Sequence, residues 1–155
     1  MTSKKTIIVP KENAVFWMDK NGAWHNEHGK FEHPKIIRHF NRSIQKDDQG
    51  YYLSQTTDGV EEKVYFPHED SVLFVVAICL EDKLKLTLNT SNTICLDPTQ
   101  LFTRNDSLYL ETPEHCIKFS QHALIQLSRQ MEEIDGRFCL VLNHTSYPIP
   151  EREKN

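Results

Sequence analysis

Histidine and carboxylate side chains gather near the N-terminus, and such side chains could hold a metal ion. The stretch contains four histidines and two glutamates, namely His25, Glu27, His28, Glu32, His33 and His39. A metal site needs ligands that converge within about 2 Å of one point, and zinc sites repeat recognisable spacings. No spacing in this stretch matches such a signature. The sequence therefore favours surface histidines, and it predicts no bound metal and no cofactor.

His115 and Cys116 are a second pair that could do chemistry, as a base and a nucleophile. Adjacent residues of a strand point to opposite faces of a sheet, so these two side chains cannot act together. No serine lies in a Gly-x-Ser-x-Gly motif, and the five glycines form no phosphate-binding loop. We therefore predict no catalytic residues.

Charged side chains flank the most apolar run of the chain, Ser71 to Leu80. Glu61, Glu62 and Lys63 precede this run, and His68-Glu69-Asp70 leads into it. An unpaired buried charge costs several kcal/mol, so such a group needs either a partner or a wet cleft. Structural pairing is the favoured interpretation, and contact with a ligand is the alternative.

The ligand alternative gives named roles to residues on both sides of a seam between two packed units. Lys63 would meet an anionic group of the ligand. Glu62 and Asp70 would accept hydrogen bonds from a base or a ribose. Trp24 and Asn89 are further predicted contacts.

The composition bounds the class of protein. The chain has 155 residues, a net charge of −4, 38% hydrophobic and 26% charged residues. These values are ordinary for one globular domain, or for two small units that share an interface. A nucleic-acid binder usually presents a basic face, so the acidic balance predicts no nucleic-acid partner.

The cysteines and the termini of the chain predict a location in the cytoplasm. Cys79, Cys95, Cys116 and Cys139 form no Cys-x-x-Cys pair and have apolar or strand-forming neighbours. This pattern is typical of buried, reduced thiols in a reducing compartment. The N-terminus has no apolar core of a signal peptide, and the longest apolar run is too short to span a membrane.

The N-terminal half is expected to form a hairpin, a helix and a second hairpin. Residues 1–12 are an expected flexible arm, in which Ile7-Ile8-Val9 could join a sheet edge. Asn21-Gly22 is a hairpin turn in which both positions need positive φ. An apolar stripe predicts a helix over about 34–45, and strands follow at 51–55 and 60–66.

The C-terminal half is expected to be a sheet closed by a helix. The run 71–80 predicts a central strand that is buried on both faces. Strands are also predicted at 84–88, 93–96, 107–111, 116–119 and 138–142. Ser120 is the expected N-cap of a helix over 120–133, which Gly136 ends.

Trp17 and Trp24 flank the first predicted turn. One is expected to point inward and the other outward, and an aromatic contact between them across the strands is favoured.

The predicted fold class is α+β with mostly antiparallel sheet. The expected divisions are an arm at 1–12, a small N-terminal unit at 13–66, a larger sheet-and-helix unit at 67–149, and a frayed tail at 150–155.

The order and spacing of several short motifs resemble a bacterial family, the domain of unknown function 1285. The matching residues are Asp19, Gly22, Trp24, Pro34, Ile37, Phe40, Gly50-Tyr51-Tyr52-Leu53, Glu62-Lys63-Val64, Glu69-Asp70, Phe74, Asn89, Leu96-Asp97, Leu101 and Leu108-Tyr109. The likeness covers about residues 14 to 133. It implies a two-part α+β protein with an internal duplication and a pleckstrin-homology-like C-terminal part. It also implies a ligand cleft between the parts, for a nucleotide-like molecule, and a role in signalling.

Together these patterns favour a non-enzymatic module that binds a small, nucleotide-like ligand or acts as a sensor. The first alternative is a protein-interaction module that uses a sheet edge or an exposed aromatic patch. The second is a metal-dependent hydrolase that uses the histidines. A homodimer is compatible with the leading function and with the first alternative.

Overall fold

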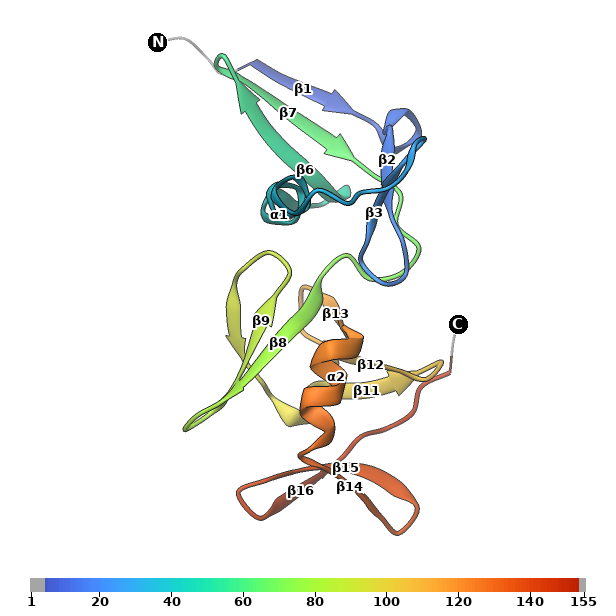
Figure 1. Ribbon diagram of the computed structural model, residues 1–155, viewed down its shortest axis with the longest axis vertical. Helices are drawn as coiled ribbons and strands as arrows, with labels where there is room; N and C mark the ends of the chain where they lie inside the picture. Colours follow the sequence, from blue (N-terminus) through green and yellow to red (C-terminus); the bar gives the residue numbers. More distant parts are fainter. Residues whose placement is uncertain (1–4, 154–155) are drawn as a thin grey trace. The chain divides into compact units, whose positions relative to one another are not determined.

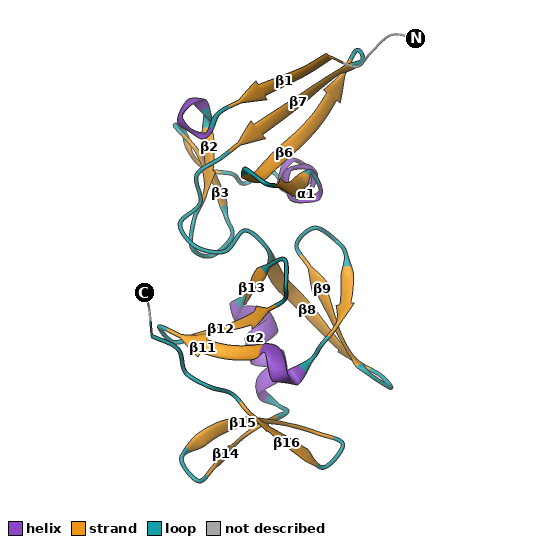
Figure 2. Ribbon diagram, turned by 180° about the vertical axis from the view of Figure 1, so that it is seen from behind, coloured by secondary structure: helices purple, strands orange, loops and turns teal. Residues whose placement is uncertain are grey.

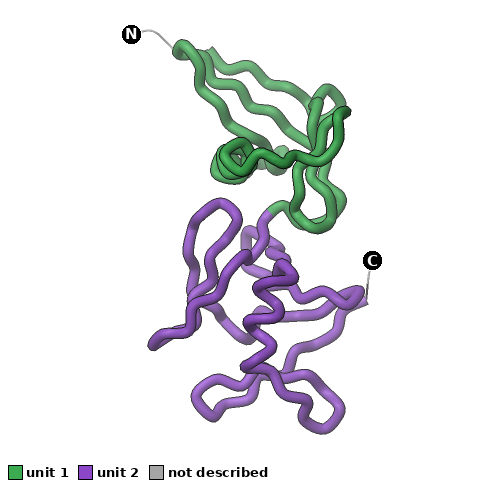
Figure 3. The backbone as a smooth tube through the Cα atoms, in the orientation of Figure 1, with its two compact units in different colours: residues 1–72 green, residues 73–155 purple. Residues whose placement is uncertain are grey.

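The computed structural model describes residues 5–153 and divides the chain into two compact units. Unit 1 spans residues 1–72 and unit 2 spans residues 73–155 (Figure 3). The predicted boundary after residue 66 lies six residues before the observed one. The fold class is α+β with mostly antiparallel sheets, which confirms the expected class.

A four-stranded sheet forms most of unit 1, in the order β1-β7-β6-β5. Figure 1 labels the first three of these strands. Its strands are β1 (Lys5–Val9), β5 (Ile44–Asp47), β6 (Gly50–Thr57) and β7 (Val60–Tyr65). β1 runs parallel to β7, and the other pairs are antiparallel. Part of the predicted arm is therefore a strand, and Ile7-Ile8-Val9 do join the sheet edge. The first four residues of that arm lie outside the described residues.

A three-stranded meander packs Phe16 and Trp24 into the core of unit 1. Its strands are β2 (Phe16–Met18), β3 (Trp24–Asn26) and β4 (Gly29–Lys30). Trp24 is buried and its ring meets the rings of Phe16, Phe40 and Phe66 at 4.9–5.7 Å between centroids. Trp17 is 38% exposed, which confirms the predicted inward and outward pair.

The predicted contact between the two tryptophans is wrong. The register places Trp17 opposite His25, and the two rings stack at 5.6 Å with 8° between their planes. The turn also differs from the prediction, because Gly22 has positive φ (83°) and Asn21 does not. An oxygen of the Asp19 carboxylate accepts from the backbone N–H groups of Asn21 and Ala23, which holds the turn without a second left-handed residue.

Helix α1 (Pro34–Arg42) begins at the predicted proline and ends before the predicted residue 45. The backbone N–H of Ser43 bonds the carbonyls of His39 and Phe40, and this closes the last turn. Ile44 was predicted to extend the apolar stripe of the helix. It instead begins β5, pairs with Leu53 and is buried, so burial in a sheet outweighs the helical pattern here.

Unit 2 contains a six-stranded sheet with the helix α2 (Gln121–Ser128) against β8 and β13 (Figure 2). The strand order is β10-β9-β8-β13-β12-β11. Their bounds are β8 (Phe74–Leu80), β9 (Leu84–Leu88), β10 (Thr93–Cys95), β11 (Leu101–Arg104), β12 (Ser107–Glu111) and β13 (Cys116–Phe119).

Burial of β8 on both faces was predicted and holds for only part of the strand. Phe74 and Val75 are buried, whereas Val76 and Leu80 are exposed. The pairing with β13 is short and reaches only Phe74 and Val75. The rest of β8 keeps its antiparallel partner β9 on one side only.

The prediction of a helix over 120–133 is wrong beyond Ser128, where α2 ends after two turns. The predicted N-cap is confirmed, because the hydroxyl of Ser120 accepts from the backbone N–H of Ala123. A hairpin then follows, with β14 (Met131–Ile134) antiparallel to β15 (Arg137–Leu142). Asp135 and Gly136 between them both have positive φ, which suits a tight hairpin turn rather than a helix end.

The chain does not fray at residue 150, which corrects another prediction. After β16 (Thr145–Pro148), Glu151 forms a bridge beside Thr103 of β11, and the Arg152 N–H donates to the Thr103 carbonyl. The Arg152 guanidinium pairs with Glu111 and lies 4.0 Å from the Phe102 ring centre. The last two residues lie outside the described residues.

The four cysteines are free, and their burial differs from the prediction. Cys139 is buried and Cys116 half-buried, but Cys79 and Cys95 are exposed. Cys79 belongs to the exposed half of β8, and Cys95 lies on the edge strand β10. None of the helices in the described part of the chain has the length and apolar character to cross a membrane.

Candidate ligand-binding site

A pocket of about 500 Å³ lies within unit 1, at the end of the sheet where β1 and β7 finish. The 3-10 turn η1 (Lys11–Asn13) follows β1 directly, and the turn between β5 and β6 meets the same end. Its walls are Ile8, Pro10, Lys11, Glu12, Gln49, Gly50, Tyr51, Tyr65, Phe66 and His68.

Aromatic rings form one side of this pocket. The rings of Tyr51 and His68 meet edge to face at 6.1 Å, and those of Phe66 and His68 at 6.1 Å. Phe66 is buried and His68 is exposed. His68 Nδ1 lies 2.7 Å from the Asp70 backbone carbonyl, which can only accept. Nδ1 therefore carries a proton, and in the neutral ring Nε2 is an acceptor.

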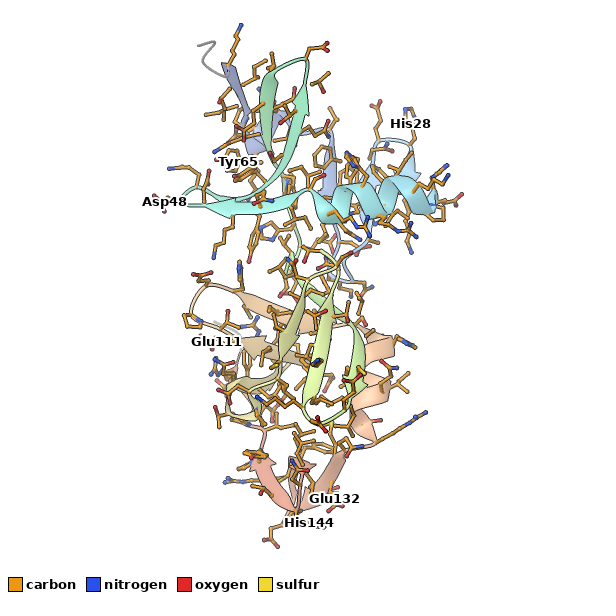
Figure 4. All side chains as sticks on the ribbon, turned by 90° about the vertical axis from the view of Figure 1, so that its left-hand side faces the viewer. His28, Asp48, Tyr65, Glu111, Glu132 and His144 are labelled. Atoms are coloured by element: carbon orange, nitrogen blue, oxygen red, sulfur yellow. The ribbon has the colours of Figure 1, made fainter. Side chains whose placement is uncertain are left out.

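A hydrogen-bonded pair, Tyr65 and Asp47, stands beside the pocket. Figure 4 labels Tyr65 of this pair. The Tyr65 hydroxyl donates to Asp47 Oδ2 at 2.5 Å, and the Gln49 backbone N–H donates to Oδ1 at 2.9 Å. Lys63 Nζ lies 3.6 Å from Asp47 Oδ2 and 4.8 Å from the Tyr52 ring centre. The Asp47 carboxylate thus accepts hydrogen bonds from a hydroxyl and a backbone amide and lies close to an ammonium group.

This arrangement sets the protonation states of the pair. The hydrogen bond to Asp47, together with burial and the carboxylate charge, raises the pKa of Tyr65 to about 12. The Tyr65 hydrogen bond outweighs burial and, with the Gln49 amide and Lys63, lowers the pKa of Asp47 from its ordinary value. At neutral pH, Tyr65 is therefore a neutral donor and Asp47 a carboxylate.

Three of the predicted site residues lie on or after β7. Lys63 pairs with Asp47 inside unit 1, which agrees with the structural interpretation of its charge. Glu62 is its neighbour on the opposite face of the strand, opposite Ile7 and Gln55. Asp70 offers its backbone carbonyl to His68. None of the three lines the pocket.

The other two predicted residues, Trp24 and Asn89, have structural contacts in different units. Trp24 is buried in unit 1, and its Nε1–H donates to Asn41 Oδ1 at 2.8 Å. Asn89 belongs to unit 2, where its Oδ1 accepts from the Phe74 N–H and its own N–H donates to the Phe74 carbonyl. These two bonds join the end of β9 to the start of β8.

Sequence reasoning missed the residues that line the pocket. Tyr51 was noted only as part of the Gly50-Tyr51-Tyr52-Leu53 motif and His68 only as part of a charged turn, and neither Tyr65 nor Asp47 was predicted as a site residue. Tyr65 comes close to Asp47 through the register of β7 and β5 on either side of β6, and no sequence motif signals this long-range pairing. Among residues 5–153, no three His, Cys, Asp or Glu side chains converge as a metal site would require.

A second hollow, of about 840 Å³, lies in unit 2 beside the C-terminal segment. Its walls are Thr99, Thr103, Gly136, Arg137, Phe138, Tyr147, Pro148, Ile149, Pro150 and Glu151. It is larger than the unit 1 pocket. We nevertheless favour the unit 1 pocket, because a Tyr–carboxylate pair and three aromatic rings converge beside it.

The fold is similar to those of two solved DUF1285 family proteins. The protein from Silicibacter pomeroyi DSS-3 shares 15% identity at a TM-score of 0.62, over 94% of this chain and 83% of that one. The protein from Shewanella baltica OS155 shares 18% identity at a TM-score of 0.52, over 74% of this chain and 91% of that one. No family model and no curated protein matches the chain. The predicted resemblance is thus confirmed at the level of the fold, to a family of unknown function.

Proposed function

We propose that the chain is a non-enzymatic module that binds a small nucleotide-like ligand in the unit 1 pocket. The observation that supports this most is the lining of the pocket, in which Tyr51, Tyr65 and His68 bring aromatic rings next to polar groups. Pockets for small ligands combine apolar and aromatic walls with a few convergent polar groups.

Each part of such a ligand has a matching group in the pocket. A planar base would stack on the Tyr51 or His68 ring. The Lys11 ammonium would pair with a phosphate, and the Gln49 side chain has both donors and acceptors for a sugar or a base. This proposal places the ligand within one unit, whereas the sequence predicted it at a seam between two units.

The proposed role is sensing in signal transduction, as the family resemblance implies. The four free cysteines fit a reducing compartment such as the cytoplasm. Glu62, Lys63, Asp70, Trp24 and Asn89 stay predictions as ligand contacts.

Thermal shift with three related compounds tests the proposal. A ligand that binds only the native state raises the melting temperature with its concentration. We expect adenosine monophosphate to raise it more than either adenosine or ribose 5-phosphate does, because only the full nucleotide fills both parts of the pocket.

Variants of the pocket sharpen this test. Lys11→Ala should bring the response to adenosine monophosphate down to that of adenosine, and Tyr51→Leu should weaken the responses to both. Lys5→Ala and Tyr147→Leu, which change residues outside this pocket, are the matched controls. A native protein that responds to none of the three compounds, or a response that both pocket variants keep, would disprove the proposal.

A further inference from the structure

β1 is an open edge of the unit 1 sheet. It ends the strand order, and β7 is its one strand neighbour among the described residues. Its sequence, Lys-Thr-Ile-Ile-Val, has strong strand-forming residues, no proline and no acidic side chain. Ile7 is 42% exposed and Ile8 is 62% exposed. Sheet edges that stay unpaired usually carry features that block pairing, and this strand has only one lysine.

We propose that two copies of this chain pair through β1, antiparallel, about a two-fold axis at Ile7. In that register Ile7 lies opposite Ile7 of the second copy, Thr6 opposite Ile8, and Lys5 opposite Val9. The strand is self-complementary in this arrangement, because its single charge faces an aliphatic side chain rather than another lysine. The two four-stranded sheets would become one continuous sheet, with a closed interface of two-fold symmetry.

The edge is small for a protein–protein interface. A stable interface buries about 1,200–2,000 Å² in total, and a five-residue edge with its side chains offers less. A dimer through this edge is therefore expected to be weak and to depend on concentration.

Ile7 separates this surface from the proposed ligand pocket. Ile8 lines the pocket, and Ile7 points to the other face of the strand, opposite Glu62 of β7. A substitution at Ile7 thus changes the residue that lies on the proposed two-fold axis, and it leaves the pocket lining intact. The dimer proposal and the ligand-pocket proposal can therefore be disproved independently of each other.

Sedimentation of the full chain over a range of concentrations tests the proposal. We expect a monomer–dimer equilibrium in the native protein and monomers for both Ile7→Lys and Ile7→Asp, because like charges would meet on the axis. A mixture of the two variants should restore dimers, since a lysine then faces an aspartate. Ile36→Lys, at an exposed position of α1, should dimerise as the native protein does. A native chain that stays monomeric throughout, or an Ile7→Lys variant that dimerises normally, would overturn the proposal.

A cross-linking experiment keeps the proposal testable if a charged variant does not fold. Facing residues of antiparallel strands have Cα atoms about 4.5–5.5 Å apart, which a disulfide spans. With the exposed Cys79 and Cys95 replaced by serine, Ile7→Cys should form a disulfide-linked dimer on mild oxidation, and Val15→Cys, at another exposed position, should not. Equal cross-linking of both variants, or none at Ile7, would also count against β1 pairing.

Discussion

Asp47 organises the polar groups beside the pocket at the scale of single residues. Its carboxylate accepts from Tyr65 and Gln49 and lies near Lys63. The sequence-based hypothesis asked whether Lys63 meets a partner or a ligand, and the structure provides a partner. The pair is partly exposed, with 25% of the Lys63 and 30% of the Asp47 side chain accessible, so water screens its charges.

We therefore expect Lys63→Ala to lower the free energy of unfolding by less than about 1 kcal/mol, as for other partly exposed ion pairs. Urea unfolding measures this, and Lys85→Ala, which removes a more exposed pair with Glu81, is the control. The melting-temperature response to adenosine monophosphate should persist in Lys63→Ala. Its loss would instead support Lys63 as a ligand contact, as the sequence predicted.

Tyr65 should ionise late in an alkaline titration. Its pKa is raised in the folded state from 10.0 to about 12, so its contribution to stability is complete below pH 10 and is lost as pH rises toward 12. The pKa of Asp47 is lowered, so its contribution is present above pH 3.8 and is lost as pH falls below that.

Absorbance of tyrosinate during an alkaline titration measures the first of these effects. One tyrosine of the native protein should ionise near pH 12, and this late step should be absent in Tyr65→Phe. Tyr52→Phe, which leaves the Asp47 bond in place, should keep it. The absence of a late ionisation step in the native protein would show that the Asp47 bond does not hold in solution.

At the scale of elements, the early end of α2 allows the segment that follows it to form a hairpin rather than a longer helix. The apolar spacing after Ser120 favours a longer helix, but Met131 to Leu142 form a hairpin. Gly136 has φ +79°, and a Cβ there would meet no atom within 4 Å. The loss of stability caused by a side chain at this position therefore comes from the backbone conformation alone, and not from a steric clash.

Gly136→Ala should destabilise unit 2 by about 1 kcal/mol, because a residue with a Cβ pays that much in the left-handed region. Urea unfolding compares it with Glu133→Ala, an exposed strand position that should change little. A helix through this segment would give the opposite sign, since alanine favours a helix over glycine.

At the scale of the whole molecule, each unit has its own buried core. Leu86, Leu101, Leu110, Ile117, Leu127 and Leu140 are among the most buried side chains, and all belong to unit 2. Domains of this size can bury enough apolar surface to fold without metals or disulfides.

We therefore expect residues 73–155 to fold when expressed alone. Dispersed amide resonances and a cooperative thermal transition would show this. Leu86→Ala in the same fragment should lower its stability by about 2–5 kcal/mol, as for other fully buried leucines. A fragment without a cooperative transition would mean that the core of unit 2 is not sufficient by itself.

The sequence determined the features that depend on residues a few positions apart. The alternation of Leu84, Leu86 and Leu88 predicted β9, and Ser120 predicted the start of α2. Turn chemistry and periodicity are local, so a single chain displays them. The internal duplication and the pleckstrin-homology-like part implied by the family resemblance stay predictions.

Only the tertiary structure decided which distant residues meet. β1 lies beside β7, Ile44 leaves the helix to pair with Leu53, and Tyr65 of β7 reaches Asp47 of β5 across β6. Long-range pairing and burial set these contacts, and they override weak local preferences. The lining of the pocket and the open edge of the sheet both follow from that register, which no local motif encodes.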